Sequence, residues 1–118
     1  MVSSWESLVV DAQDPARLAR WWAEALGYQI THEKPTEVEI RRTPDQSPGL
    51  IFVPVPEAKE IKNRLHIDLR PDDTEAEVER LIDMGARRVD VGQPADATWM
   101  VLADPEGNEF CVLRSAGG

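Results

Sequence analysis

Apolar and polar residues alternate along several short segments of this chain, which is the pattern of β-strands that bury one face. The alternation is clearest in residues 7–12, 64–69 and 109–113. Shorter runs predict further strands near residues 28–31, 37–42, 50–55, 87–91 and 98–103. Residues 104–108, Asp-Pro-Glu-Gly-Asn, have the composition of a tight turn before the last strand.

Two other segments repeat their apolar residues with the period of an amphipathic helix. In the first, Asp14 is the expected N-cap, Pro15 takes the first helical position and Gly27 ends the helix. The second is expected over about residues 72–84, where Asp72 and Glu75 have the spacing of a capping box. The apolar stripes are Leu18, Trp21, Trp22, Ala25 and Leu26 in the first helix and Val78, Leu81 and Ile82 in the second.

The same order of elements occurs twice. Gly27 and Gly85 end the two helical patterns, Gly49 and Gly107 open the last strand of each half, and both pairs are 58 residues apart. A repeat that fills a small chain predicts two copies of one β-α-β-β-β module, at about residues 5–55 and 63–114. We therefore expect an α+β fold in which the modules form a curved mixed sheet around a cleft, with both helices on the outer face.

Composition and charge exclude several classes of partner and several structural features. The 118 residues suit a single domain, and a net charge of −9 disfavours nucleic acids and anionic membrane surfaces as partners. One cysteine excludes an intrachain disulfide. No apolar run approaches the roughly 20 residues of a membrane span, and residues 1–6 lack the features of a signal peptide. The expected location is the cytoplasm.

Strand alternation also predicts which side chains face the cleft. If the apolar residues of the 64–69 strand face a helix, then Arg64, His66 and Asp68 face the other way. One histidine and one glutamate on separate strands of that face, His66 and Glu109, could bind a divalent metal or transfer a proton. The other expected cleft residues are Ser7 and Asp11 on the first strand, Ile51 on the fourth and Cys111 on the last.

Three further residues could contact a small molecule. Trp5 and Trp99 could form the walls of a pocket for a flat apolar ligand, although packing in the core explains either one equally well. Arg64 could hold a carboxylate or phosphate, whereas Lys59 and Lys62 are expected to be solvated residues of a connector.

Several of these motifs resemble the vicinal oxygen chelate superfamily, and within it the small glyoxalase-like proteins of actinobacteria. They are Val-Val-Asp-Ala-Gln-Asp-Pro at residues 9–15, Leu-His-Ile-Asp-Leu at 65–69 and Asp-Pro-Glu-Gly-Asn-Glu-Phe at 104–110. The superfamily includes glyoxalase I, bleomycin-resistance proteins, fosfomycin-resistance enzymes and extradiol dioxygenases. The resemblance implies one glyoxalase-like domain over residues 1–118, a small-molecule ligand or substrate, and a homodimer.

The resemblance also implies a divalent metal held by up to four side chains, one each from the first, fourth, fifth and eighth strands. Those positions match Ser7 or its neighbour, Ile51, His66 and Glu109. Neither Ser7 nor Ile51 is a credible ligand, so the ligand set is incomplete. Asp68 or Asp11 could substitute for a missing ligand.

Two function classes follow. The first is a lyase- or isomerase-like enzyme that uses His66 and Glu109 as acid and base. The second is a metal-independent protein that binds and sequesters a small molecule, as the bleomycin-resistance members do. A purely structural role for Glu109 is a third possibility, because a carboxylate removed from water needs a partner, and His66 or Arg64 could supply it.

Overall fold

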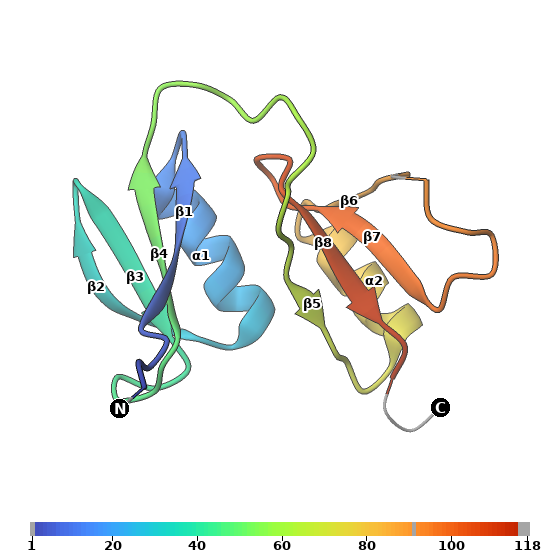
Figure 1. Ribbon diagram of the computed structural model, residues 1–118, viewed down its shortest axis with the longest axis horizontal. Coiled ribbons are helices and arrows are strands. Elements are labelled where there is room, and N and C mark those ends of the chain that lie inside the picture. The colour runs from blue at the N-terminus through green and yellow to red at the C-terminus, as the bar shows by residue number, and fades with distance from the viewer. Residues whose placement is uncertain (1, 91, 116–118) are drawn as a thin grey trace. The chain divides into compact units, whose positions relative to one another are not determined.

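The computed structural model describes residues 2–90 and 92–115, and the chain divides into two compact units, Met1–Ala58 and Lys59–Gly118. Each unit holds one helix and one four-stranded mixed sheet (Figure 1). The first contains β1 (Ser7–Ala12), α1 (Pro15–Leu26), β2 (Gln29–Lys34), β3 (Glu37–Arg41) and β4 (Gly49–Pro54). The second contains β5 (Asp68–Leu69), α2 (Thr74–Asp83), β6 (Arg87–Arg88), β7 (Trp99–Ala103) and β8 (Glu109–Leu113). The predicted α+β fold of two β-α-β-β-β modules is confirmed.

The two sheets share one topology. Their strand orders are β1-β4-β3-β2 and β5-β8-β7-β6. In each, the first and last strands of the module pair in parallel, and the other neighbours are antiparallel. The register sets Ile51 opposite Val9 in the first unit and Cys111 opposite Asp68 in the second. The spacing of 58 residues in the sequence therefore reflects a duplicated arrangement of strands.

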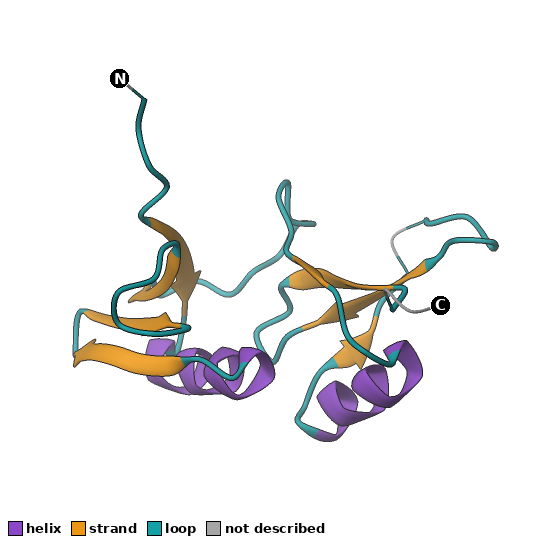
Figure 2. Cartoon of the chain, turned by 90° about the horizontal axis from the view of Figure 1, so that it is seen from below, coloured by secondary structure: helices purple, strands orange, loops and turns teal. Residues whose placement is uncertain are grey.

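Helix α1 forms where the sequence predicts it. The Asp14 side chain accepts a hydrogen bond from the backbone N–H of Arg17, and Gly27 ends the helix in the left-handed conformation with φ of 68°. Figure 2 shows each helix against one face of its own sheet. In the first unit the residues between them form a core that includes Leu18, Trp22, Ile40 and Phe52. Among the described residues, no helix has the length and apolar character needed to cross a membrane.

Two predictions about the second unit were wrong in their boundaries. Helix α2 is capped by Asp73, which accepts from the N–H of Ala76, so Asp72 lies outside the helix. The strand expected over residues 64–69 is formed only at Asp68–Leu69, because Arg64 and Leu65 lie in a bend. The segment before this bend is attached to β8 by the Asn63 N–H, which donates to a side chain of that strand. Residue 91, the end of the strand expected at 87–91, lies outside the described residues.

The face of the first sheet that points away from α1 carries a network around Arg41, which is 7% exposed. Its guanidinium donates to both oxygens of Glu39, to the Gln46 carbonyl, to the Ser47 hydroxyl and to Glu6. The side chain lies over Gly49, where an added Cβ would approach Arg41 Cγ to 3.0 Å. This network joins the N-terminal segment, β3 and the turn before β4.

We expect Arg41→Met to destabilise the protein by about 2 to 4 kcal/mol, because it leaves Glu39 half-buried without its cation. Urea unfolding followed by tryptophan fluorescence measures this change. The matched control is Arg42→Met, at the exposed neighbouring residue, which should change stability by less than about 0.5 kcal/mol. Equal effects of the two substitutions would contradict this role of the network.

Candidate functional site

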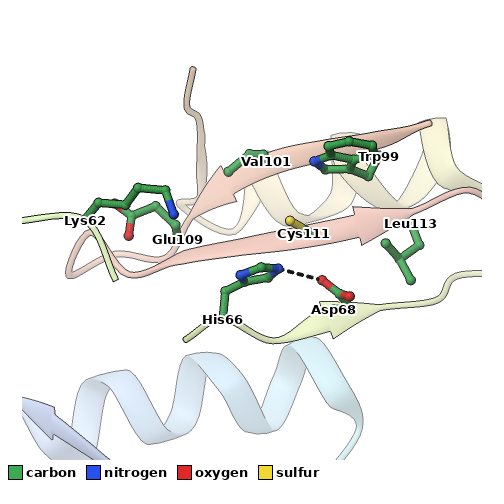
Figure 3. A pocket seen from close by; sticks show the side chains of 8 residues that line it. All are labelled: Lys62, His66, Asp68, Trp99, Val101, Glu109, Cys111 and Leu113. Carbon is green, nitrogen blue, oxygen red and sulfur yellow. Dashed lines mark ion pairs between the residues drawn. The ribbon is translucent and has the colours of Figure 1, made fainter. Parts of the chain in front are cut away.

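A pocket of about 290 Å³ lies on one face of the second unit's sheet (Figure 3). Successive residues of β7 and β8 point to opposite faces, so every second side chain lines the pocket. The residues between them, Leu102, Phe110 and Val112, are fully buried and, with Val78 and Leu81 of α2, form the core on the other face. The lining residues are Lys62, His66, Asp68, Trp99, Val101, Glu109, Cys111 and Leu113.

Glu109, at the start of β8, is held on both carboxylate oxygens. Lys59 Nζ donates to Oε2 at 2.8 Å and the backbone N–H of Asn63 donates to Oε1 at 2.8 Å. The Lys59 and Glu109 side chains are only 17% and 13% exposed. Desolvation is the largest influence on the pKa of Glu109 and raises it, but the hydrogen bonds from Lys59 and Asn63 together outweigh it, so the pKa is lowered. The carboxylate is therefore ionised, weakly basic and already paired.

The partners of Glu109 differ from those expected. Arg64 and His66 were the candidate partners, but Arg64 is exposed in a bend, outside the pocket lining, and His66 pairs with Asp68. The residues that do pair with Glu109, Lys59 and Asn63, lie in an irregular segment. No periodic pattern marks such a segment, so strand alternation carried no signal for them.

His66, Asp68 and Cys111 form a second cluster in the middle of the pocket. His66 Nε2 lies 3.1 Å from Asp68 Oδ1, and one ligand atom from each of the three residues lies within 4.8 Å of the others. The pKa of the Cys111 thiol is raised, first by burial and then by the charge and hydrogen bonding of Asp68. Cys111 is consequently a protonated thiol, which makes it a poor nucleophile.

The pocket has unlike ends. Figure 3 shows Lys62 and Glu109 at one end and Trp99 and Leu113 at the other. Trp99, Val101 and Leu113 make the second end apolar, and the Trp99 ring is half-buried there. Such a pocket offers an aromatic wall at one end and polar groups along its floor, which suits a small ligand with a flat apolar part.

The remaining predicted site residues belong to the first unit: Trp5, Ser7, Asp11 and Ile51. They lie on or next to β1 and β4. Asp11 and Ile51 alternate with the buried Ala12 and Phe52, whereas Ser7 and Leu8 are both half-buried. Trp5 is 64% exposed, and its indole N–H donates to the Ser7 carbonyl at 3.0 Å. The lining of the second unit's pocket contains none of these four residues.

The residues present do not fit the metal implied by the resemblance. Glu109 is already paired with the Lys59 ammonium, and the fourth-strand position is the apolar Ile51. The register places Val9, another apolar residue, opposite Ile51 on β1, two residues beyond Ser7. Of the four family positions, only His66 and Glu109 carry credible metal ligands, and Glu109 is paired with Lys59. A metal at that position would therefore lack the ligands that the family's chemistry requires.

Comparison with known proteins agrees with the fold. A family model described as a glyoxalase-like domain matches residues 7–113. A search of curated proteins finds no match. Similar solved structures include a glyoxalase/bleomycin resistance protein/dioxygenase family enzyme from Burkholderia phytofirmans PsJN, at 18% identity and a TM-score of 0.69, covering 92% of this chain and 96% of that one.

Two other similar structures have contrasting functions. Trypanothione-dependent glyoxalase I from Leishmania major is 14% identical with a TM-score of 0.72, and covers 98% of this chain and 89% of its own. TnmS3, an antibiotic binding protein from Streptomyces sp. CB03234, is 17% identical with a TM-score of 0.62, and covers 98% of each chain. At these identities the likeness shows a shared fold. Together with the family match over residues 7–113, it shows that this chain belongs to the glyoxalase-like domain family of the vicinal oxygen chelate superfamily.

Proposed function

We propose that this protein binds a flat, largely apolar small molecule in the pocket of its second unit, and that it does not use the metal chemistry of glyoxalase I. The proposal is based on the pairing of Glu109 with Lys59 and with the backbone N–H of Asn63. The Lys59 ammonium lies 2.8 Å from Oε2 and already balances the charge of the carboxylate, so a metal ion at Glu109 would have to compete with this cation. The same pairing lowers its basicity, which disfavours it as a general base.

The lining of the pocket supports this function. Its volume, about 290 Å³, lies at the lower end of the range for ligand pockets, about 300–1,000 Å³, so a small ligand is expected. Trp99 offers a ring face for stacking, while Val101 and Leu113 extend the apolar surface. Lys62 and the His66–Asp68 pair could orient polar groups of the ligand. The antibiotic binding described for TnmS3 is a precedent for ligand binding on this fold.

A second candidate function is catalysis by proton transfer. The observation that favours it is the 3.1 Å contact of His66 Nε2 with Asp68 Oδ1, because a carboxylate commonly fixes the orientation of a catalytic imidazole. His66 would then act as acid or base, with Asp68 as its positioning residue and Glu109 outside the reaction. The two candidates differ in the effect of His66→Ala, which abolishes turnover in an enzyme but costs a binding protein only part of its affinity.

The domain organisation and assembly belong to the same proposal. The family match crosses both units, which supports treating residues 1–118 as one domain. A homodimer is expected from the resemblance, and the cytoplasm is the location expected from the composition. Sedimentation velocity of the untagged protein should give twice the mass of one chain, and a monomer at micromolar concentration would contradict the assembly.

The Trp99 wall is tested with 8-anilinonaphthalene-1-sulfonate, a flat aromatic probe. We expect one probe molecule per chain and about tenfold weaker binding in Trp99→Leu, because the stacking surface is lost. Probe fluorescence gives the stoichiometry and affinity. Leu65→Ala is the matched control, since Leu65 is an apolar residue of the same unit that is 80% exposed and outside the pocket lining. Equal binding by Trp99→Leu and the wild type, or weakening by Leu65→Ala, would contradict a Trp99 pocket.

The role of Glu109 is tested by the pH dependence of stability. Its pKa is lowered in the folded protein, so its stabilisation is complete above the ordinary value of 4.5 and is lost as the pH falls through the lower folded pKa. We expect Glu109→Gln to destabilise the protein by about 1 to 3 kcal/mol near neutral pH, with the difference from wild type shrinking below 4.5.

Urea unfolding at a series of pH values measures both effects. The control is Glu60→Gln, an exposed residue of the same connecting segment, which should unfold like the wild type throughout. A difference between Glu109→Gln and wild type that stays constant as the pH falls would show that ionisation of Glu109 does not stabilise the fold.

A further inference from the structure

Going beyond the proposed function, we propose that His66, Asp68 and Cys111 form a binding site for a soft divalent cation of the zinc type. This site is displaced along the sheet from the family's metal position. It uses neither Glu109 nor any residue of the first unit. Figure 3 shows the Cys111 sulfur on β8 facing the His66 and Asp68 side chains, with Glu109 farther along the strand.

The backbone fixes the spacing of two of the ligands. Asp68 and Cys111 are register partners on the adjacent parallel strands β5 and β8, and the Cys111 N–H donates to the Ile67 carbonyl at 2.9 Å. His66 lies two residues before Asp68, on the same side of the chain in Figure 3. Continuing this register by two residues leads from Cys111 to Glu109. The proposed site therefore shares His66 with the family's metal position and takes its other two ligands, Asp68 and Cys111, from the next row of side chains.

The distances are close to those that a tetrahedral ion needs. Ligand atoms bound to zinc at about 2.0 to 2.3 Å lie about 3.3 to 3.6 Å from one another. Here His66 Nε2 and Asp68 Oδ1 are 3.1 Å apart, and no pair among the three residues exceeds 4.8 Å. His66 and Asp68 have side chains that are 45% and 49% exposed and can rotate, whereas Cys111 is buried and stays in place. Rotations that move atoms by about 1 Å would complete the set.

The donor atoms select the class of ion. An imidazole nitrogen, a carboxylate oxygen and a sulfur suit zinc or cobalt, whereas magnesium and calcium prefer oxygen ligands alone. On binding, the thiol gives its proton to solvent and becomes a thiolate, so thiolate and carboxylate together balance the charge of a divalent ion. Three protein ligands leave one position for water or for a donor atom of a pocket ligand.

The test is titration of untagged protein with Co²⁺, whose bond to a thiolate gives a charge-transfer absorption in the near ultraviolet. We expect one Co²⁺ per chain with this absorption, and competition by Zn²⁺. Cys111→Ser should abolish the absorption, and both Cys111→Ser and Asp68→Asn should weaken binding at least about tenfold, since even loss of an outer partner of a ligand costs about 10–100-fold. Circular dichroism of each variant checks folding, and the exposed Asp68 makes Asp68→Asn informative if Cys111→Ser is unstable.

Glu109→Gln separates this site from the family's metal position. The proposal expects a folded Glu109→Gln variant to bind one Co²⁺ per chain with the same thiolate absorption, because Cys111 makes the bond that gives this band and Glu109 is no ligand. A folded Glu109→Gln variant that binds no Co²⁺, or binds it without this absorption, would overturn the proposal, as would a wild-type protein that behaves in either way. The Co²⁺ titrations contain no anilinonaphthalene probe. A protein that binds no Co²⁺ can therefore be distinguished from one that binds no small aromatic molecule.

Discussion

A carboxylate can leave water only if its oxygens find donors elsewhere, and Glu109 finds them in Lys59 and in the backbone of Asn63. These two bonds tie residues 59–63 to the first residue of β8. Residues 59–63 lead through the bend at Arg64 and Leu65 into His66, so this attachment also holds the segment of chain that enters the pocket.

The same attachment separates this chain from the metal enzymes of its family. The fold places a histidine, His66, and a carboxylate, Glu109, on one face of the sheet. In this chain the carboxylate forms an ion pair with Lys59. Farther along the face, His66 and Asp68 pair with each other beside Cys111, and neither forms an ion pair with a lysine or arginine among the described residues. Trp99 and Leu113 make the far end apolar. A shared fold therefore does not carry a shared chemistry, because chemistry depends on which donor atoms are free.

Strand alternation and helix capping depend on residues close together in the sequence, and they predicted several strands and helix ends of this structure. Strands β1 and β8 and the start of α1 occur where alternation and the Asp14 cap place them. The stop at Gly27 follows from its left-handed conformation. The choice between Asp72 and Asp73 as the second cap was missed, because both residues can accept the same kind of bond and only the folded chain selects one.

The candidate site was predictable only in part for the same reason. Strand phase identified His66, Asp68, Glu109 and Cys111, which all line the pocket. It could not identify Lys59, which is 50 residues from its partner in an irregular segment, nor the turn of Arg64 toward solvent. Likewise, the network around Arg41 joins residues whose spacing has no period. Long-range ion pairs leave no periodic pattern in a single sequence.

The attachment of Asn63 to Glu109 is tested most directly by amide hydrogen exchange of Asn63, measured by NMR. If the Asn63 N–H donates to Glu109, its exchange should be slow in the wild type although it lies in an irregular segment, and it should accelerate markedly in Glu109→Ala, which removes the acceptor. The amide of Cys111, which donates to the Ile67 carbonyl at 2.9 Å, provides a reference for general loosening of the unit. An Asn63 amide that exchanges as fast as an unstructured one in the wild type would show that Glu109 is free, and the account built on its engagement would be wrong.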